Sequence, residues 1–313
     1  IIFTVLFFTV ACLLSLNPTK IIDVIGKFLT PIKLTFIGLL VVTAIIHPIG
    51  SFQAPSAGYA SHVFFKGFKE GYFTLDALVA FVFGIIIVNA MKEKGAVSKK
   101  QLMIVCAKST AIAAALLALI YSALSYMGAS SVEKLGLLEN GAEVLAKVSS
   151  YYFGPYGSVF LGLMITVACL TTSVGLITAC SSFFHGLFPN ISYKKIAVIL
   201  SMFSTLVANI GLTQLINVSM PVLTTLYPIA ISLIFLTFLH PLFKGKREVY
   251  QGSLILTFII SLFDGLNAAG LKIAAINQFF NQFLPMYDIG LGWVLPAILG
   301  GIGGYLIHRL RKC

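Results

Sequence analysis

Long runs of apolar residues, separated by short polar segments, make up most of the chain. A transmembrane helix needs about 20 mainly apolar residues, because its backbone must satisfy its own hydrogen bonds inside the hydrocarbon. Runs of this size predict nine membrane-spanning helices, the first shorter than the rest. The predicted spans are residues 1–16, 28–47, 72–91, 104–127, 155–181, 194–212, 218–240, 250–268 and 289–308.

The composition, taken together with this pattern, predicts the fold class. Of the 313 residues, 58% are hydrophobic and 10% are charged, and the mean hydropathy is +1.00. Soluble domains carry about 25% charged residues. Lipid rather than water must therefore cover most of the surface, and we expect an all-α, polytopic membrane protein in a lipid bilayer.

The basic residues predict the orientation. Cytoplasmic loops of membrane proteins are enriched in Lys and Arg, and most of the 21 such residues fall in alternate loops, with Lys33 counted among them. The other loops hold only Lys66, Lys69, Lys134, Lys147 and Lys272. We therefore expect a cytoplasmic C-terminus and an extracytoplasmic first residue. Topology explains the net charge of +11 better than nucleic-acid binding does.

The chain begins inside an apolar run, and its first residue is Ile rather than Met. Neither the basic segment nor the small-residue cleavage site of a signal peptide is present. Because the first residue is also predicted to be extracytoplasmic, we expect a chain truncated at its N-terminus, with earlier helices missing.

The five cysteines and five histidines are scattered along the chain. No pair has the spacing of metal ligands, and no Cys-x-x-Cys motif occurs. We therefore expect neither a disulfide framework nor a cofactor.

Two acidic residues fall within predicted spans, Asp76 and Asp264. An ionisable group in the bilayer costs a few kcal/mol and usually faces a cavity, a partner or an ion. Asp264 lies near the end of its span, where we interpret it as an interfacial residue that reaches water. Asp76 lies in the unusual segment 71–84, which combines small residues, a threonine and aromatic residues. Transporters build binding sites where such helices are broken; the alternative is that Gly84 serves only for packing.

A run of hydroxyl residues, Thr171, Thr172 and Ser173, lies in the fifth predicted span. Three consecutive residues cover most of the circumference of a helix, so at least one must face the bundle interior. Hydroxyl and carbonyl oxygens suit a hard cation such as Na⁺. The alternative is that these hydroxyls bond to carbonyls in the preceding turn or to a neighbouring helix.

Small residues near the C-terminus predict a close helix contact. Gly300 and Gly304 form a Gly-x-x-x-Gly pair, which in membrane helices allows two backbones to approach each other. We interpret this pair as packing rather than as a site.

Five phrases in fixed order resemble the BrnQ-type branched-chain amino acid:cation symporter family. They are Leu16–Lys20, Gly71–Leu78, Ala168–Thr172, Ala208–Gln214 and Leu262–Leu266. The resemblance extends over essentially the whole chain.

This family is similar to the amino acid–polyamine–cation superfamily, so the resemblance implies a LeuT-type fold with two inverted five-helix repeats. The nine spans would be helices 4–12 of twelve in a single transmembrane domain, residues 1–313. Residues 1–48 would end the first repeat, 72–240 would form the second, and 250–308 would be the accessory helices 11 and 12.

The resemblance also implies a Na⁺ site made by the carbonyl of Ala168 and the hydroxyls of Thr171 and Thr172. The substrate would meet the aromatic-Thr-Leu phrase at the helix break, with Phe81 as a lid and two residues of the hydroxyl helix at its border. The implied substrate contacts are Phe73, Thr74, Leu75, Asp76, Ala77, Phe81, Ser173 and Leu176.

The implied function is import of Leu, Ile and Val across the cell membrane, coupled to Na⁺ or H⁺ by alternating access, without enzymatic activity and without an obligate protein partner. The hydroxyl run favours Na⁺, and Asp76 keeps H⁺ open. One alternative is an amino acid sensor on a transporter fold. Another is an intramembrane aspartyl protease using Asp76 and Asp264, although neither lies in a Gly-x-Gly-Asp phrase.

Overall fold

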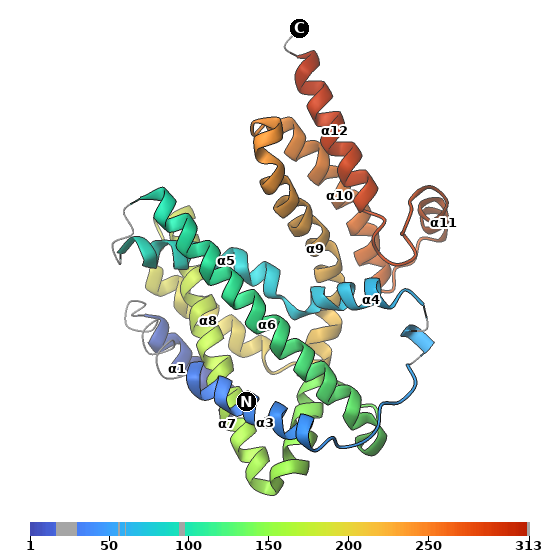
Figure 1. The fold of residues 1–313 in the computed structure, drawn as a ribbon. Helices are drawn as coiled ribbons and strands as arrows, with labels where there is room; N and C mark the ends of the chain where they lie inside the picture. The colour runs from blue at the N-terminus through green and yellow to red at the C-terminus, as the bar shows by residue number, and fades with distance from the viewer. Residues whose placement is uncertain (17–29, 56, 60, 94–97, 312–313) are drawn as a thin grey trace. The chain divides into compact units, whose positions relative to one another are not determined.

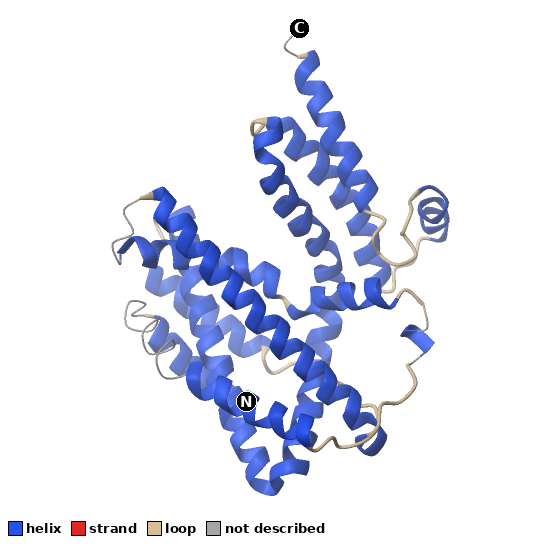
Figure 2. Ribbon diagram, viewed as in Figure 1, coloured by secondary structure: helices blue, strands red, loops and turns tan. Residues whose placement is uncertain are grey.

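The computed structural model describes residues 1–16, 30–55, 57–59, 61–93 and 98–311. Within these ranges the chain consists of helices joined by loops, with no strand (Figure 2). Residues 17–29, which include the start of the second predicted span and most of the phrase at 16–20, lie outside the described part.

Figure 1 shows the helices in chain order. They are α1 (Ile2–Ser15), α3 (Thr30–Ile46), η2 (Ala57–Tyr59), α4 (Val63–Glu70), η3 (Gly71–Thr74), α5 (Asp76–Glu93), α6 (Lys99–Leu135), α7 (Gly141–Leu187), α8 (Tyr193–Val207), α9 (Leu212–Phe243), α10 (Arg247–Ala268), α11 (Ala274–Phe283) and α12 (Val294–Leu310).

A helix lies at each of the nine predicted positions. In the described residues, α6, α7, α9 and α10 are long and apolar enough to cross a membrane, whereas α1, α3 and α12 are shorter apolar helices. The all-helical membrane class is thereby confirmed. The number of crossings stays a prediction.

Helix α7 is longer than its predicted span because two helices join at a kink. Gly154 has φ 59° and ψ −147°, a conformation that favours glycine, and Pro155 follows it. Proline suits the first position of a helix because its missing N–H would have no helical partner there. The predicted start at residue 155 therefore coincides with the second of the two helices.

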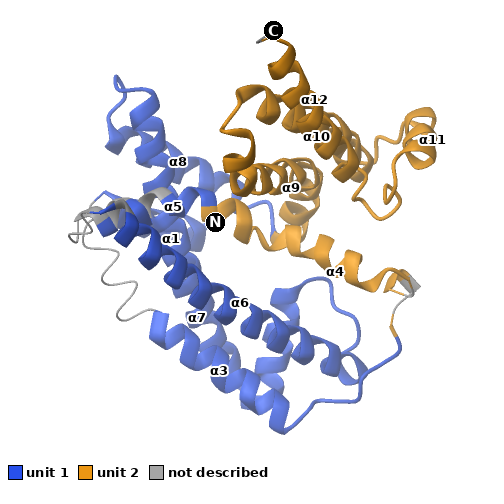
Figure 3. Cartoon of the chain, turned by 45° about the horizontal axis from the view of Figure 1, so that its top comes forward, with its two compact units in different colours: residues 1–54, 81–211 blue, residues 55–80, 212–313 orange. Residues whose placement is uncertain are grey.

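The described chain forms two compact units (Figure 3). Unit 1 comprises residues 1–54 and 81–211, and unit 2 comprises residues 55–80 and 212–313. The predicted repeats divide the chain at different places, and that division stays a prediction based on the resemblance.

In unit 1, α7 packs against α1 and α8 through small and branched residues. Ala11, Val174, Ile177 and Ala197 form the buried cluster at this contact. A second cluster joins α3, α6 and the first part of α7. The parts of α7 before and after the kink are thus each held by neighbours within its own unit.

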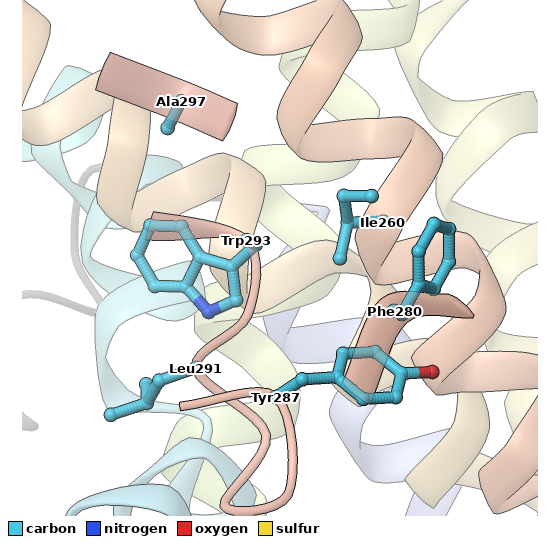
Figure 4. Close-up of a cluster of buried hydrophobic side chains, with 6 residues drawn as sticks. All are labelled: Ile260, Phe280, Tyr287, Leu291, Trp293 and Ala297. Atoms are coloured by element: carbon cyan, nitrogen blue, oxygen red, sulfur yellow. The ribbon is translucent and has the colours of Figure 1, made fainter. Parts of the chain in front are cut away.

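In unit 2, α10 packs against both α9 and α12. A Cβ atom on Gly300 would overlap the carbonyl of Gly252, and one on Gly304 would overlap the carbonyl of Glu248. The predicted packing role of the Gly300 and Gly304 pair is therefore confirmed. The loop before α12 carries the chain's single tryptophan, Trp293, in a buried cluster (Figure 4).

Candidate functional site

The predicted helix break lies at Leu75. The 3-10 helix η3 ends at Thr74, Leu75 adopts a left-handed conformation with φ 66° and ψ −1°, and α5 begins at Asp76. A non-glycine residue in this conformation is uncommon and costs about 1–3 kcal/mol. The Leu75 N–H donates to the Tyr72 carbonyl at 3.4 Å, and the first α5 hydrogen bond in this region runs from the Val79 N–H to the Leu75 carbonyl. The N–H groups of Ala77 and Leu78 therefore point out of the helix end.

Two buried tyrosines lie beside this break. Tyr72 and Tyr227 stack with ring centroids 4.9 Å apart and an interplanar angle of 7°. They are 3% and 2% exposed, and neither hydroxyl has a hydrogen-bond partner in the described part of the chain. The Tyr227 hydroxyl lies near the backbone N–H groups of Ala77, Leu78 and Leu75, and the Tyr72 hydroxyl lies near the indole N–H of Trp293, which also has no partner in the described residues.

Unpartnered buried polar groups are rare in folded proteins, and each costs about 1–3 kcal/mol. Two such hydroxyls lie beside the end of a helix, where N–H groups favour negative charge. Sequence reasoning selected the segment and missed Tyr72 and Tyr227. Tyr72 could have been found because it lies inside the selected phrase. Tyr227 has no sequence signal beyond its position before Pro228.

The predicted substrate residues of unit 2 differ in their surroundings. Phe73 and Ala77 are half-buried and pack against the two tyrosines. The Thr74 hydroxyl donates to the Gly71 carbonyl at 2.8 Å, so it closes the 3-10 turn. Leu75 is exposed and supplies the break itself, while Asp76 begins α5.

The predicted ion ligands of unit 1 converge on one carbonyl. The hydroxyls of Thr171 and Thr172 both donate to the carbonyl oxygen of Ala168, at 2.7 and 3.1 Å. Thr171 is buried and Thr172 is exposed. The structure thus brings the three predicted ligands together, in a geometry that back-bonding within a helix also produces.

Lys33 adds a positive charge to this cluster. Its ammonium donates to the Thr171 hydroxyl oxygen at 3.1 Å. The charge count assigned Lys33 to a cytoplasmic loop, whereas in the structure it lies one turn into α3. The sequence could have indicated this position, since Lys33 falls inside the predicted span 28–47.

The remaining predicted substrate residues, Phe81, Ser173 and Leu176, belong to unit 1. Phe81 is 44% exposed, and the other two are half-buried on α7. Within this unit the ring of Phe83 occupies the place where a Cβ on Gly175 would lie. Helix α5 therefore contacts α7 directly after the hydroxyl run. The substrate roles of the three residues stay predictions.

These features define a multi-pass helical membrane protein with one helix broken beside unpartnered polar groups. The chain belongs to the branched-chain amino acid transport protein family, whose sequence model matches residues 1–311. This confirms the resemblance noted in the sequence. The family consists of transporters, so the expectation that the chain is not an enzyme is also confirmed.

Several curated relatives match nearly the whole chain. It is 79% identical to the branched-chain amino acid permease BrnQ of Bacillus subtilis over 311 residues, which are 99% of this chain and 71% of the relative. It is 40% identical to the branched-chain amino acid transport system 2 carrier protein of Pseudomonas aeruginosa, over 99% of this chain and 70% of that protein. No solved structure matches the chain.

Proposed function

We propose that this protein imports Leu, Ile and Val across the cell membrane, coupled to Na⁺ or H⁺, by alternating access in a LeuT-type fold with a cytoplasmic C-terminus. Membership of a family of branched-chain amino acid transport proteins supports the substrate class. The single structural observation that carries the proposal is the break at Leu75, where a helix end meets the unpartnered hydroxyls of Tyr72 and Tyr227.

The substrate carboxylate binds at the N-terminal end of α5. Backbone N–H groups and the positive end of the helix dipole favour a negative charge there, and the hydroxyls of Tyr72 and Tyr227 donate to the same group. Phe73 and Ala77 supply apolar surface for the aliphatic side chain. An apolar pocket distinguishes one methylene by only about 1–3 kcal/mol, so Leu, Ile and Val compete for one site.

The coupling cation binds at the carbonyl of Ala168 and the hydroxyls of Thr171 and Thr172. The ammonium of Lys33 donates to the Thr171 hydroxyl oxygen, so this one oxygen of the set already has a cationic partner. Na⁺ must displace that ammonium in order to use the same oxygen. A cation that binds one conformation better than the other shifts the conformational equilibrium by its difference in affinity, which couples its gradient to substrate movement.

Uptake of radiolabelled leucine into proteoliposomes containing the full chain tests this proposal. We expect accumulation above the external concentration when a Na⁺ or a pH gradient is imposed, and competition by Ile and Val. The two gradients, applied separately, identify the coupling ion. Binding without accumulation would instead indicate a sensor, and cleavage of a peptide would indicate a protease.

A further inference from the structure

Unit 2 contains a cavity of about 720 Å³ with charged side chains in its lining. It lies among α4, the end of α10, α11 and the loop that precedes α12, and Phe73 and Met220 supply part of its apolar wall. Neither Tyr72 nor Tyr227 lines it, so it is distinct from the hydroxyl pair at the helix break. Its volume is in the range of small-molecule sites, about 300–1,000 Å³.

Two opposite charges face this cavity without pairing. Asp264 of α10 and Lys69 of α4 both line it, and both are half-buried. They are near enough that Lys69 acts electrostatically on Asp264. Yet within the described residues neither side chain makes a hydrogen bond or an ion pair. A charge removed from bulk water is costly unless it is paired, so each of these groups gains from a ligand of opposite charge.

The cavity carries no net charge that would favour a simple cation or anion. Its remaining charged lining residues are Lys66, Lys272, Glu70 and Asp288. Lys66 is already engaged, since its ammonium donates to the carbonyl of Gly58. A balanced site with two separated, unpaired charges matches a ligand that carries both charges itself.

The wall that carries Asp264 is held rigidly in place. Asn267, one turn beyond Asp264, exchanges two hydrogen bonds with Asn277 of α11, at 2.7 and 2.8 Å. The Tyr287 hydroxyl donates to the same Asn277 oxygen at 2.9 Å. The Tyr287 ring packs on Phe280 in the buried cluster (Figure 4). A site held in its binding geometry loses less entropy when a ligand binds.

Lys69 lies against the loop that precedes α12. Its side chain lies where a Cβ on Gly290 would be, and Gly290 has φ 78°. Only glycine adopts this conformation readily. The end of the lysine side chain therefore lies against the backbone of this loop, at the edge of the cavity.

We propose that this cavity binds a second zwitterionic α-amino acid, with its ammonium on Asp264, its carboxylate on Lys69 and its aliphatic side chain against Met220 of α9. The choice of leucine as the probe ligand rests on the proposed transport function. The preference for a zwitterion is independent of that function, because it follows from the charges of Asp264 and Lys69.

Equilibrium binding of radiolabelled leucine to the full chain in nanodiscs tests this site. We expect the wild-type protein to bind two molecules per chain, and Asp264→Asn or Lys69→Gln to bind one. Asp264→Glu and Lys69→Arg keep the charges and should bind two. Glu139→Gln and Lys134→Gln make the same exchanges at residues outside the cavity lining and should also bind two.

The two single variants come from different helices, so a folding defect in one leaves the other as a test, and gel filtration identifies such a defect. 4-Methylpentanoate lacks the ammonium and 3-methylbutylamine lacks the carboxylate. We expect that neither compound displaces the second leucine from the wild-type protein, which is the molecule that Asp264→Asn no longer binds.

The outcomes separate the two proposals. Wild-type protein that accumulates leucine but binds one molecule, or variants that still bind two, would overturn the cavity site alone. A second molecule that depends on Asp264 in protein that accumulates no leucine would support the cavity and overturn transport. Wild-type protein that binds no leucine would overturn both.

Discussion

The hydroxyl run of α7 and the cavity of unit 2 are both polar places in an apolar protein, but their polar groups are satisfied differently. Thr171 and Thr172 have a partner one turn away at Ala168. Asp264 and Lys69 have none within the described chain. A group bonded inside its own helix is stable with or without a ligand, whereas an unpaired charge at a cavity is most stable when a ligand is present.

The two places also differ in how far apart their residues lie in the sequence. The hydroxyl run is a single phrase, and its back-bonding follows from helix geometry alone. The cavity assembles residues of α4, α9, α10, α11 and the loop before α12. Contact between such segments depends on packing rather than on local pattern. Helix α10, which carries Asp264, packs against α12 with no room for a side chain at Gly300 or Gly304.

Gly304→Leu should therefore have the largest effect on the cavity side of this comparison. The new side chain must occupy the place of the Glu248 carbonyl, and overpacking of this kind costs about 3 kcal/mol. Trp293 is the only tryptophan and is 5% exposed, so its fluorescence reports on unit 2. We expect a red-shifted emission and a lower unfolding midpoint in detergent.

Gly303→Leu is the matched control, because no atom lies within 4 Å of a Cβ at that position. A leucine there faces open space, so we expect a stability change within about 0.5 kcal/mol. Equal effects of the two substitutions would contradict the close approach of α10 and α12.

The sequence predicted the long helices because an apolar run of about 20 residues has few alternatives in a membrane. It missed α4 and α11, which are short, amphipathic and placed in segments that the span count treated as loops. The first part of α7 was missed for a different reason: Pro155 begins a new helix, and the polar segment before it resembles a loop.

The candidate sites show the same limit. The hydroxyl run was predictable because its three residues are consecutive. The prediction of orientation counts Lys33 with a loop, because it uses only the number of basic residues between spans. It contains no information about which side chains Lys33 contacts. We interpret Asp264 from the sequence as a residue that reaches water, and it does line a cavity. Its neighbour there, Lys69, lies almost two hundred residues away in the sequence, so no local pattern links the two. Only the packed fold reveals this relation.

Alanine substitutions sharpen the α7 side of the comparison. Thr171→Ala removes a buried hydroxyl that also accepts from Lys33, so we expect it to raise the Na⁺ concentration for half-maximal leucine uptake about tenfold, or about 1.4 kcal/mol. Thr172→Ala removes an exposed hydroxyl and should have a smaller effect. A Thr171→Ala, Thr172→Ala double variant with wild-type Na⁺ dependence would show that the ion-site assignment is wrong.

Lys33→Met tests whether the lysine ammonium and Na⁺ compete for Thr171. Loss of one charge-assisted hydrogen bond to this oxygen is worth about 1 kcal/mol, so the half-maximal Na⁺ concentration should fall about fivefold. Lys33→Arg keeps a cation and should stay near the wild-type value. A rise in the Na⁺ requirement of Lys33→Met would mean that the lysine assists the ion rather than competing with it.

Tyr287→Phe should have the smallest effect and probes the wall of the cavity without touching its charges. Losing the bond to Asn277 and the longer one from Asn267 costs about 1 kcal/mol, measured as a lower unfolding midpoint of Trp293 fluorescence. Burial, aided by the charge of Asp264, raises the pKa of Tyr287 above its ordinary value of 10.0. The unfolded chain therefore loses this proton first, so the stability from the neutral phenol is complete below pH 10 and declines as pH rises toward the folded pKa. Tyr287→Phe should lack this part of the alkaline decline, while Tyr305→Phe, at an exposed position on α12, should keep it. An identical decline in all three proteins would place the Tyr287 hydroxyl in water, and the wall that carries Asp264 would then lack its anchor.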